Sequence, residues 1–388
     1  MIRRFLWKII SLVYKYIVKP IAFLQTPDKA HAKMIGLVST IGRFALVRWL
    51  IRLVFKTSLD KRLVQSYHGV EFKSPVGLSA GLDKNGEILP VIASLGFGFG
   101  EVGSVTARPY AGNPRPWFYR LPKSRSLVVY VGLGNYGSSA VIKRLGQYKA
   151  DITKDFPVIL SVAKTNSRQV VSVQDGIDDY VTTVRRAKNK KFIQLIELNI
   201  SCPNTYGGEP FTSVERLERL LSAIDKVDLT QPVFIKMPSD LTWDKSKELL
   251  DVIVNHKVVG VTIANLAKDR TKIKLQDDLP DTVRGNLSGK PTQAINDELI
   301  RRTYLAYGDR LTIIGVGGIF SADDAYRKIR LGASLVELIT GLIFCGPQLM
   351  SEINDGLVAR LTRDGFSHIS QAIGVDASGE YKNTITTT

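Results

Sequence analysis

The sequence is poor in the residues that build metal centres and disulfide frameworks. Its 388 residues include two cysteines, Cys202 and Cys345, and four histidines. Two thiols cannot form a disulfide scaffold or a cysteine-rich zinc or iron–sulfur site, and they favour a reducing compartment. The histidines show no metal-ligand spacing. We therefore expect no metal site and assign no role to any histidine.

Two further patterns are missing. No spaced-glycine fingerprint of dinucleotide binding follows the first expected strand, which argues against an open doubly wound sheet. Lys or Arg interrupts every apolar segment before it reaches the roughly 18 residues of a membrane-spanning helix. We therefore expect no helix that crosses a bilayer. Hydrophobic residues still make up 44% of the chain, which is typical of a globular protein.

Acidic residues are scarce near the amino terminus. The formal net charge is +17, and more than half of this surplus lies in residues 1–56, where Asp28 is the only acid. A surplus concentrated in one segment, without an added RNA-binding domain, does not favour a nucleic-acid partner. We expect none.

The same segment has helical periodicity. Apolar residues recur at helical spacing through residues 2–17 and again from about Ile35 to Phe55, with basic residues between them and a break near Pro20 and Pro27. Basic amphipathic helices lie on anionic membrane surfaces. We expect residues 1–60 to form a module that holds the protein peripherally at the cytoplasmic face of the cell membrane. The alternatives are a helical pair packed on the next domain and, less favoured, a cleaved signal peptide.

Strand and helix patterns alternate from residue 61 onward. This alternation indicates parallel βαβ units and predicts an α/β fold, a closed (β/α)8 TIM barrel over residues 61–355, followed by a polar, partly disordered tail over residues 356–388. The expected strands are Val76 to Ser79, Gly100 to Val105, Val158 to Val162, Ile193 to Asn199, Val233 to Lys236, Val259 to Ala264, Thr312 to Gly315 and Ser334 to Leu338.

A cysteine loop follows the fourth expected strand, where a barrel places its active site. Cys202 lies between Asn199 and Asn204. A thiol, with an ordinary pKa of about 8.5, can be tuned toward neutrality for general-base work. We expect Cys202 to abstract a proton from a substrate held by the neighbouring amides.

Lysines and glycines follow other strands. Lys84 comes after the first strand, Lys236 ends the fifth, and glycines follow the seventh and eighth, where many barrels bind phosphate. Each feature alone also fits an ordinary turn or a solvent-exposed lysine. A phosphate site, a cation beside a ring and a base together indicate chemistry that uses flavin mononucleotide (FMN).

These motifs resemble those of the dihydroorotate dehydrogenase family over almost the whole chain to about Ile353. The resemblance implies FMN-dependent oxidation of (S)-dihydroorotate to orotate in de novo pyrimidine (UMP) biosynthesis, with Cys202 as the base. The amino-terminal helices are similar to those of the membrane-bound class, in which a quinone accepts the electrons. The strongest segments are Gly81 to Gly86, Gly112 to Pro116, Asn199 to Asn204, Leu287 to Gly289 and Ile314 to Ile319.

Matched positions imply two sets of contacts. Substrate contacts are Lys84, Asn135, Asn199, Asn204 and Asn265. Flavin contacts are Ala80, Gly81, Lys84, Ser104, Ser161, Asn199, Lys236, Gly289, Gly318, Thr340 and Gly341.

The chain departs from the quinone class at several positions. Cys202 replaces the serine that this class usually carries, and cysteine is typical of the soluble class. The loop from Val129 to Asn135 reads Val-Tyr-Val-Gly-Leu-Gly-Asn where the class typically reads Asn-Arg-Met-Gly-Phe-Asn-Asn, so Val129 replaces an orotate-binding asparagine. Leu266 likewise stands where a hydroxyl-bearing residue is common.

The alternatives follow from these departures. A missing hydrogen bond to a buried polar substrate costs about 1–3 kcal/mol, so another dihydropyrimidine or an enone is the alternative substrate. A flavin-barrel tRNA reductase is less favoured, because the basic residues cluster in the first helices and no RNA-binding domain is added. A membrane-surface binding protein on an inactive barrel is less favoured too, because Lys84, Cys202 and the asparagines are all present.

Overall fold

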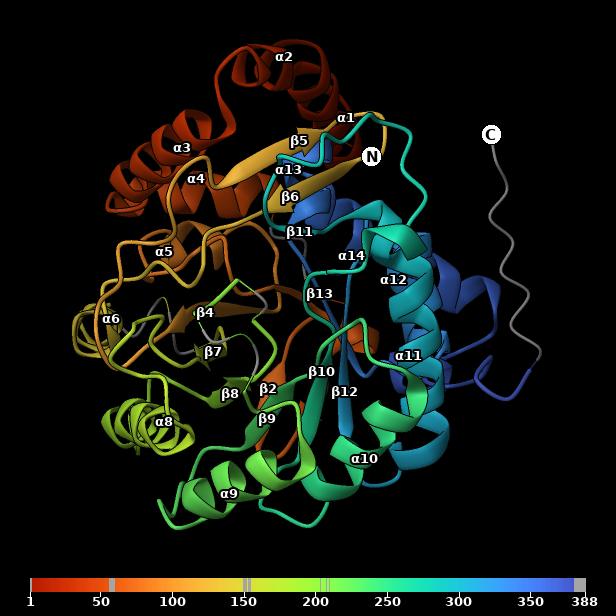
Figure 1. The fold of residues 1–388 in the computed structure, drawn as a ribbon. Coiled ribbons are helices and arrows are strands. Elements are labelled where there is room, and N and C mark those ends of the chain that lie inside the picture. The colour runs from red at the N-terminus through yellow and green to blue at the C-terminus, as the bar shows by residue number, and fades with distance from the viewer. Residues whose placement is uncertain are drawn as a thin grey trace.

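The centre of the molecule is a closed parallel barrel. The computed structural model describes residues 2–55, 60–148, 152, 155–202, 204–206, 208 and 210–379. The expected (β/α)8 fold is confirmed, and each expected strand overlaps one strand of the barrel (Figure 1). In ring order the strands are β3 (Val76–Leu78), β4 (Phe99–Val105), β7 (Val158–Val162), β8 (Leu195–Asn199), β9 (Val233–Lys236), β10 (Gly260–Ile263), β12 (Thr312–Val316) and β13 (Leu335–Leu338).

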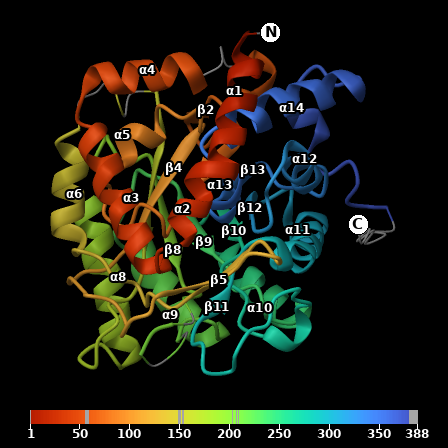
Figure 2. The same ribbon diagram turned by 90° about the horizontal axis from the view of Figure 1, so that it is seen from above.

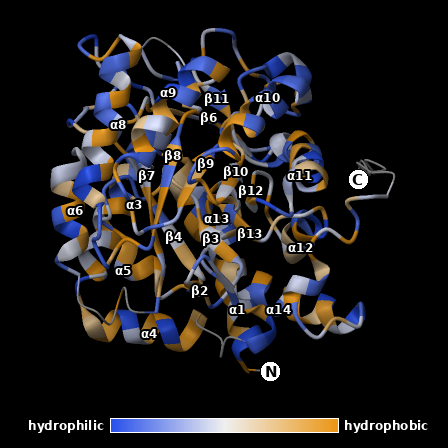
Figure 3. Ribbon diagram, turned by 90° about the horizontal axis from the view of Figure 1, so that it is seen from below, coloured by the Kyte–Doolittle hydropathy of each residue, from blue (hydrophilic) through white to orange (hydrophobic). Residues whose placement is uncertain are grey.

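Amphipathic helices surround this barrel. In α8 (Val173–Ala187), for example, Ile177, Tyr180 and Val184 share the buried face, as expected for helical spacing. Coloured by hydropathy, the surrounding helices carry both apolar and polar segments (Figure 3). The others are α5 (Leu89–Ile92), α6 (Ser138–Gly146), α9 (Val214–Asp225), α10 (Trp243–Ile253), α11 (Gln293–Tyr307), α12 (Ala322–Arg330), α13 (Thr340–Cys345) and α14 (Leu349–Arg363).

Small sheets lie at both ends of the barrel. The hairpin of β1 (Gln65–Tyr67) and β2 (Val70–Phe72) turns at His68 and Gly69, both at positive φ. Its Phe72 joins an apolar cluster with residues from six barrel strands. The other sheet, in the order β11 (Asn286–Leu287), β6 (Ser126–Val129) and β5 (Phe118–Leu121), is antiparallel. Figure 1 places it between the barrel and the amino-terminal helices.

The amino-terminal module differs in detail from the expected two helices. Helix α1 (Ile2–Val13) continues through a π-helical turn (Tyr14–Val18) into α2 (Lys19–Phe23). Pro20 does not end this helix; it lies in the first turn of α2, directly after the π-helical turn, where the change in hydrogen-bond spacing accommodates its missing N–H. Seen from above, the module lies over the barrel (Figure 2).

The expected helix from Ile35 to Phe55 is two helices, α3 (Pro27–Ile41) and α4 (Ala45–Phe55). Buried Arg48 explains the break, because its Nη1 donates to the carbonyls of Gly42 and Arg43 and so satisfies the end of α3. Gly42 allows a close approach, since a Cβ there would lie 2.9 Å from Val91 Cγ2. Within the described residues no single helix is long and apolar enough to cross a membrane. Helices α3 and α4 have that length and apolarity only when taken together, as a pair bent by 106°.

Polar contacts tie this module to the rest of the molecule. The Asp28 carboxylate on α3 accepts hydrogen bonds from the backbone N–H groups of Trp117 and Phe118 and pairs with Arg115 at 3.1 Å. Within the module, Trp7 Nε1 on α1 donates to the carbonyl of Val54 on α4 at 2.8 Å. Helix α3 is therefore held against β5.

The carboxyl-terminal segment is ordered beyond the boundary expected at residue 355. Helix α14 crosses that boundary, and Arg330 then pairs with Asp364 at 3.1 Å and Asp376 at 2.6 Å. Ile369 and Ala372 are buried. Residues 380–388 of the expected tail lie outside the described residues.

Candidate active site

One large cavity joins the mouth of the barrel to the amino-terminal module. Its volume is about 580 Å³. The end at the strand termini is lined by polar residues that include Lys84, Asn199 and Lys236, and the other end by apolar residues such as Met34 and Val38 of α3. A polar ligand and an apolar ligand could therefore meet within one enclosed space.

Cys202 and the asparagines expected near it come together at the polar end. The thiol of Cys202 is half-buried at the cavity wall, and Asn199, Asn204 and Asn265 line the same wall. Asn265 Nδ2 donates to Asn199 Oδ1 at 3.1 Å, and Asn199 Nδ2 donates to Ser104 Oγ at 2.8 Å. This network orients the amides around the thiol.

Lys84 brings a positive charge to this wall. Its Nζ donates to the Gly81 carbonyl at 2.7 Å and lies 3.5 Å from His31 Nε2 on α3. Burial lowers the pKa of Lys84 to about 8. Burial and the charges of Lys84 and Arg115 lower the pKa of His31 to about 3. At neutral pH a largely charged ammonium can therefore donate to a neutral imidazole.

His31 is a cavity residue to which the sequence assigned no role. Its ring lies 5.1 Å from that of Phe118 on β5, and it lines the cavity beside Lys84. No sequence spacing indicates this position, because α3 and the loop after β3 meet only when the module packs over the mouth.

Glycines at positive φ form the part of the cavity that is suited to a phosphate. Gly289, Gly317 and Gly318 have φ values of +83°, +97° and +72°, and all three line the cavity. A Cβ at Gly341 would lie 2.0 Å from the Ile319 carbonyl oxygen. Backbone free of side chains can approach a phosphate closely. Asn296 Oδ1 receives no hydrogen bond from a described donor, so it could accept one from a ligand hydroxyl.

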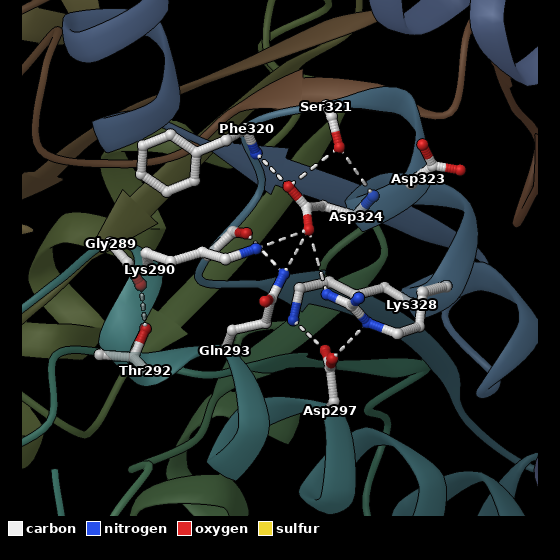
Figure 4. Close-up of polar contacts among 12 residues, drawn as sticks. Gly289, Lys290, Thr292, Gln293, Asp297, Phe320, Ser321, Asp323, Asp324 and Lys328 are labelled. Atoms are coloured by element: carbon white, nitrogen blue, oxygen red, sulfur yellow. Dashed lines mark hydrogen bonds and ion pairs between the residues drawn. The ribbon is translucent and has the colours of Figure 1, made fainter. Parts of the chain in front are cut away.

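An ionic network holds these glycine loops in place (Figure 4). The Asp324 carboxylate of α12 accepts hydrogen bonds from Lys290 Nζ at 2.9 Å and from Gln293 Nε2 at 2.7 Å. Gln293 Nε2 also donates to the Gly318 carbonyl at 2.7 Å. Lys290 directly follows Gly289, so Asp324 links the two loops.

Two expected contact residues do not line the cavity. The amide of buried Asn135 donates to Thr106 Oγ1 and the Leu133 carbonyl and accepts from the Gly137 N–H, so it supports its own loop. Ser161 is also buried, and its Oγ lies 2.9 Å from Ser104 Oγ. The other expected contact residues all line the cavity.

Apolar residues line the cavity where the resemblance leads to polar ones. Val129 and Leu266 are on the cavity wall. The Val129 carbonyl accepts a hydrogen bond from Asn204 Nδ2 at 2.9 Å. The backbone of this residue is therefore used, but its side chain offers a substrate no polar contact.

The fold and the site define an enzyme of the (β/α)8-barrel class, with its polar groups at the carboxyl ends of the strands. The dihydroorotate dehydrogenase family model matches residues 62–361. A dihydroorotate dehydrogenase (quinone) of Mycolicibacterium smegmatis is 35% identical over 91% of this chain and 96% of its own length. That of Haloarcula marismortui is 35% identical over 93% and 98%.

Solved structures are similar as well. The dihydroorotate dehydrogenase of Eimeria tenella in complex with ferulenol has a TM-score of 0.78 and 26% identity, over 91% of this chain and 96% of that one. The chain therefore belongs to the dihydroorotate dehydrogenase family, and it is an oxidoreductase. Membership implies a flavin cofactor, and the residues of the cavity fit one.

We predict that Asp324→Asn weakens the glycine loops. Lys290 and Gln293 would lose a charged acceptor, so the free energy of unfolding should fall by about 1–3 kcal/mol and flavin should dissociate more readily. Burial raises the pKa of Asp324, but Lys290, Gln293 and other donors outweigh burial and lower the pKa to about 2. The lost stability is present in the wild type above the unfolded-state pKa of about 3.9 and disappears as pH falls toward the folded value.

Chemical denaturation at several pH values, with retained flavin measured by absorbance, tests this prediction. Asp323→Asn is the matched control, because Asp323 is exposed on the same helix and pairs with Arg360. Equal flavin retention in both variants would contradict the role given to Asp324.

Proposed function

We propose that this enzyme oxidises (S)-dihydroorotate to orotate in de novo pyrimidine biosynthesis, with FMN as its cofactor and a membrane quinone as electron acceptor. The observation that carries the proposal is the single cavity that has Cys202, Lys84 and the asparagines at one end and an apolar passage beneath α3 at the other. The family and the names of the relatives support the same activity.

FMN, when bound, supplies the acceptor for the hydride that leaves the substrate. Ala80, Gly81, Ser104 and Lys236 would flank its ring, with Ser161 acting through Ser104. Its phosphate would be held by Gly289, Gly318, Thr340 and Gly341.

Cys202 would take the proton from the ring carbon next to the one that loses the hydride. The Lys84 ammonium would pair with the substrate carboxylate, and Asn199, Asn204 and Asn265 would bind the ring amides. Asn265 already donates to Asn199, and the amide of Asn286 donates to Asn204, so substrate would exchange some of these bonds for its own. Ordered amides lose little freedom on binding, which favours a fixed orientation of substrate.

The quinone would enter between the helices of the amino-terminal module. Met34, Val38 and Ile51 line this apolar end, and His31 offers a polar contact near its inner limit. On the outer surface Phe5, Leu46 and Trp49 are exposed, at 65%, 67% and 55%. With the basic residues of the module they would hold it on an anionic membrane surface, which we place at the cytoplasmic face.

We predict that Cys202→Ala retains flavin but slows its anaerobic bleaching by dihydroorotate about 10²- to 10⁴-fold, the usual contribution of a general base. Cys202→Ser should keep more activity at high pH than at neutral pH, because a hydroxyl is a weaker acid than a thiol. Stopped-flow absorbance measures both rates. An unchanged rate in Cys202→Ala would remove this residue from the mechanism.

We also predict that Met34→Trp lowers the rate with quinone at least about tenfold, while the rate with a soluble artificial acceptor stays close to that of the wild type. The larger side chain would fill the apolar passage. Leu37→Trp is the matched control, because Leu37 is on the same helix but is 64% exposed. Equal losses with both acceptors would contradict an acceptor passage beneath α3.

A second candidate function is oxidation of another dihydropyrimidine or reduction of an enone. The apolar side chains of Val129, Leu133 and Leu266 on the cavity wall favour it. For dihydroorotate as the natural substrate, Val129→Asn should lower KM by a factor of about 5 to 150, which corresponds to the 1–3 kcal/mol of one buried hydrogen bond. If KM rises instead and a less polar dihydropyrimidine bleaches the wild-type flavin faster, the second candidate is favoured.

A further inference from the structure

Four ionisable side chains meet inside the barrel below the cavity. Lys236 of β9 lies 3.2 Å from a carboxylate oxygen of Glu101 on β4 and 3.5 Å from one of Glu197 on β8. Glu337 of β13 interacts with all three. We call Glu101, Glu197 and Glu337 the acid cluster. The acid cluster is at most 1% exposed, so water does not solvate its charges.

The charges of this group do not balance if every carboxyl is ionised. Three carboxylates and one ammonium give a net charge of −2 (−3 + 1). The other described groups in contact are neutral, namely the Ser79, Ser161 and Thr262 hydroxyls and the Ala80 N–H. An unbalanced charge in a dry interior is so unfavourable that the group binds protons instead. Two bound protons would bring the net charge to zero.

The contacts among the carboxyls indicate where these protons are. Glu101 is within hydrogen-bonding reach of both Glu197 and Glu337. Two ionised carboxylates have no hydrogen to share, and Glu101 Oε1 and both Glu337 carboxylate oxygens receive no hydrogen bond from a described donor. One proton on Glu197 and one on Glu337 would give each of the two carboxyl–carboxyl contacts, Glu101 with Glu197 and Glu101 with Glu337, the hydrogen that it needs.

The pKa directions agree with this arrangement. Burial and the charge of Glu101 raise the pKa values of Glu197 and Glu337 well above the ordinary glutamate value. The pKa of Glu101 is lowered, because Lys236 and the hydrogen bonds it accepts outweigh its burial. Glu101 is therefore the ionised member.

We propose that Glu197 and Glu337 each keep a proton at neutral pH and each donate a hydrogen bond to ionised Glu101, so that the acid cluster sets the charge that Lys236 presents to the cofactor. Lys236 lines the cavity, and Glu101 also accepts a hydrogen bond at 2.7 Å from Ala80, another cavity residue. The effect on a flavin rests on the proposed function. The presence of the two bound protons does not rest on the proposed function, because it follows from the contacts and burial of the protein's own side chains.

Infrared spectroscopy of the flavin-free protein tests the protons directly. The wild type should show carbonyl bands of protonated carboxylic acids that shift in D₂O, and Glu337→Gln and Glu197→Gln should each remove one. Glu215→Gln is the control, because Glu215 is exposed on α9, and it should remove none. Absence of such bands in the wild type at neutral pH would overturn the proposal even if no variant folds.

Stability against pH gives a second readout without cofactor. Because the folded-state pKa of Glu337 is raised, its stabilising contribution is present below the unfolded-state pKa and is lost as pH rises toward the folded value. The unfolding free energy of Glu337→Gln should therefore fall less than that of the wild type between about pH 5 and about pH 8. Parallel curves would contradict a proton on Glu337.

The flavin potential of the holoenzyme then tests the effect on the cofactor. Replacing Glu101, Glu197 and Glu337 together by glutamine removes every carboxyl that could balance Lys236 within the acid cluster. The unbalanced ammonium should favour the more negative reduced ring and raise the midpoint potential. Glu337→Gln replaces a neutral acid by a neutral amide and should leave the potential at neutral pH unchanged. If the triple variant also leaves the potential unchanged, the acid cluster does not set the charge at the cofactor. Failure of dihydroorotate to bleach the flavin would instead contradict only the proposed function.

Discussion

The closure of eight parallel strands into one ring is the constraint on which the site depends. Because the strands are parallel, their carboxyl ends all face the same way, and residues far apart in the chain meet at one mouth. Lys84, Cys202 and Asn265 come from different strand ends and line one cavity for this reason. The same closure encloses Lys236 and the acid cluster, because inward side chains of a small barrel have no route to water.

The amino-terminal module turns this open mouth into a cavity with two ends. Asp28 fixes α3 against β5, and Arg48 satisfies the carbonyls at the bend between α3 and α4. Both are buried charged groups whose partners are other parts of the module or its neighbouring sheet. The helices therefore have two faces with different tasks, one that lines the cavity and one that exposes apolar and basic residues.

Much of the fold and the site could be predicted from the sequence. Alternating apolar runs and helical periods indicated all eight barrel strands, and motifs at strand ends indicated Lys84, Cys202 and the glycine loops. Breaks between helices were less predictable. Pro20 lies where proline is tolerated, while the break after α3 depends on Arg48, whose buried contacts arise only from packing. Asn135 was expected to contact substrate, but its bonds to Thr106 and Leu133 orient it within its own loop.

The sequence by itself determined the periodicity, and so the barrel, along with the chemistry available at each strand end, because both depend on residue order along the chain. It also determined that Cys202 follows the fourth strand between Asn199 and Asn204, which makes it the candidate base. Only the tertiary structure decided which side chains meet across the barrel. His31 beside Lys84, and Glu337 beside Glu101, join residues separated by tens or hundreds of positions. Such contacts depend on packing geometry, which local sequence patterns do not encode.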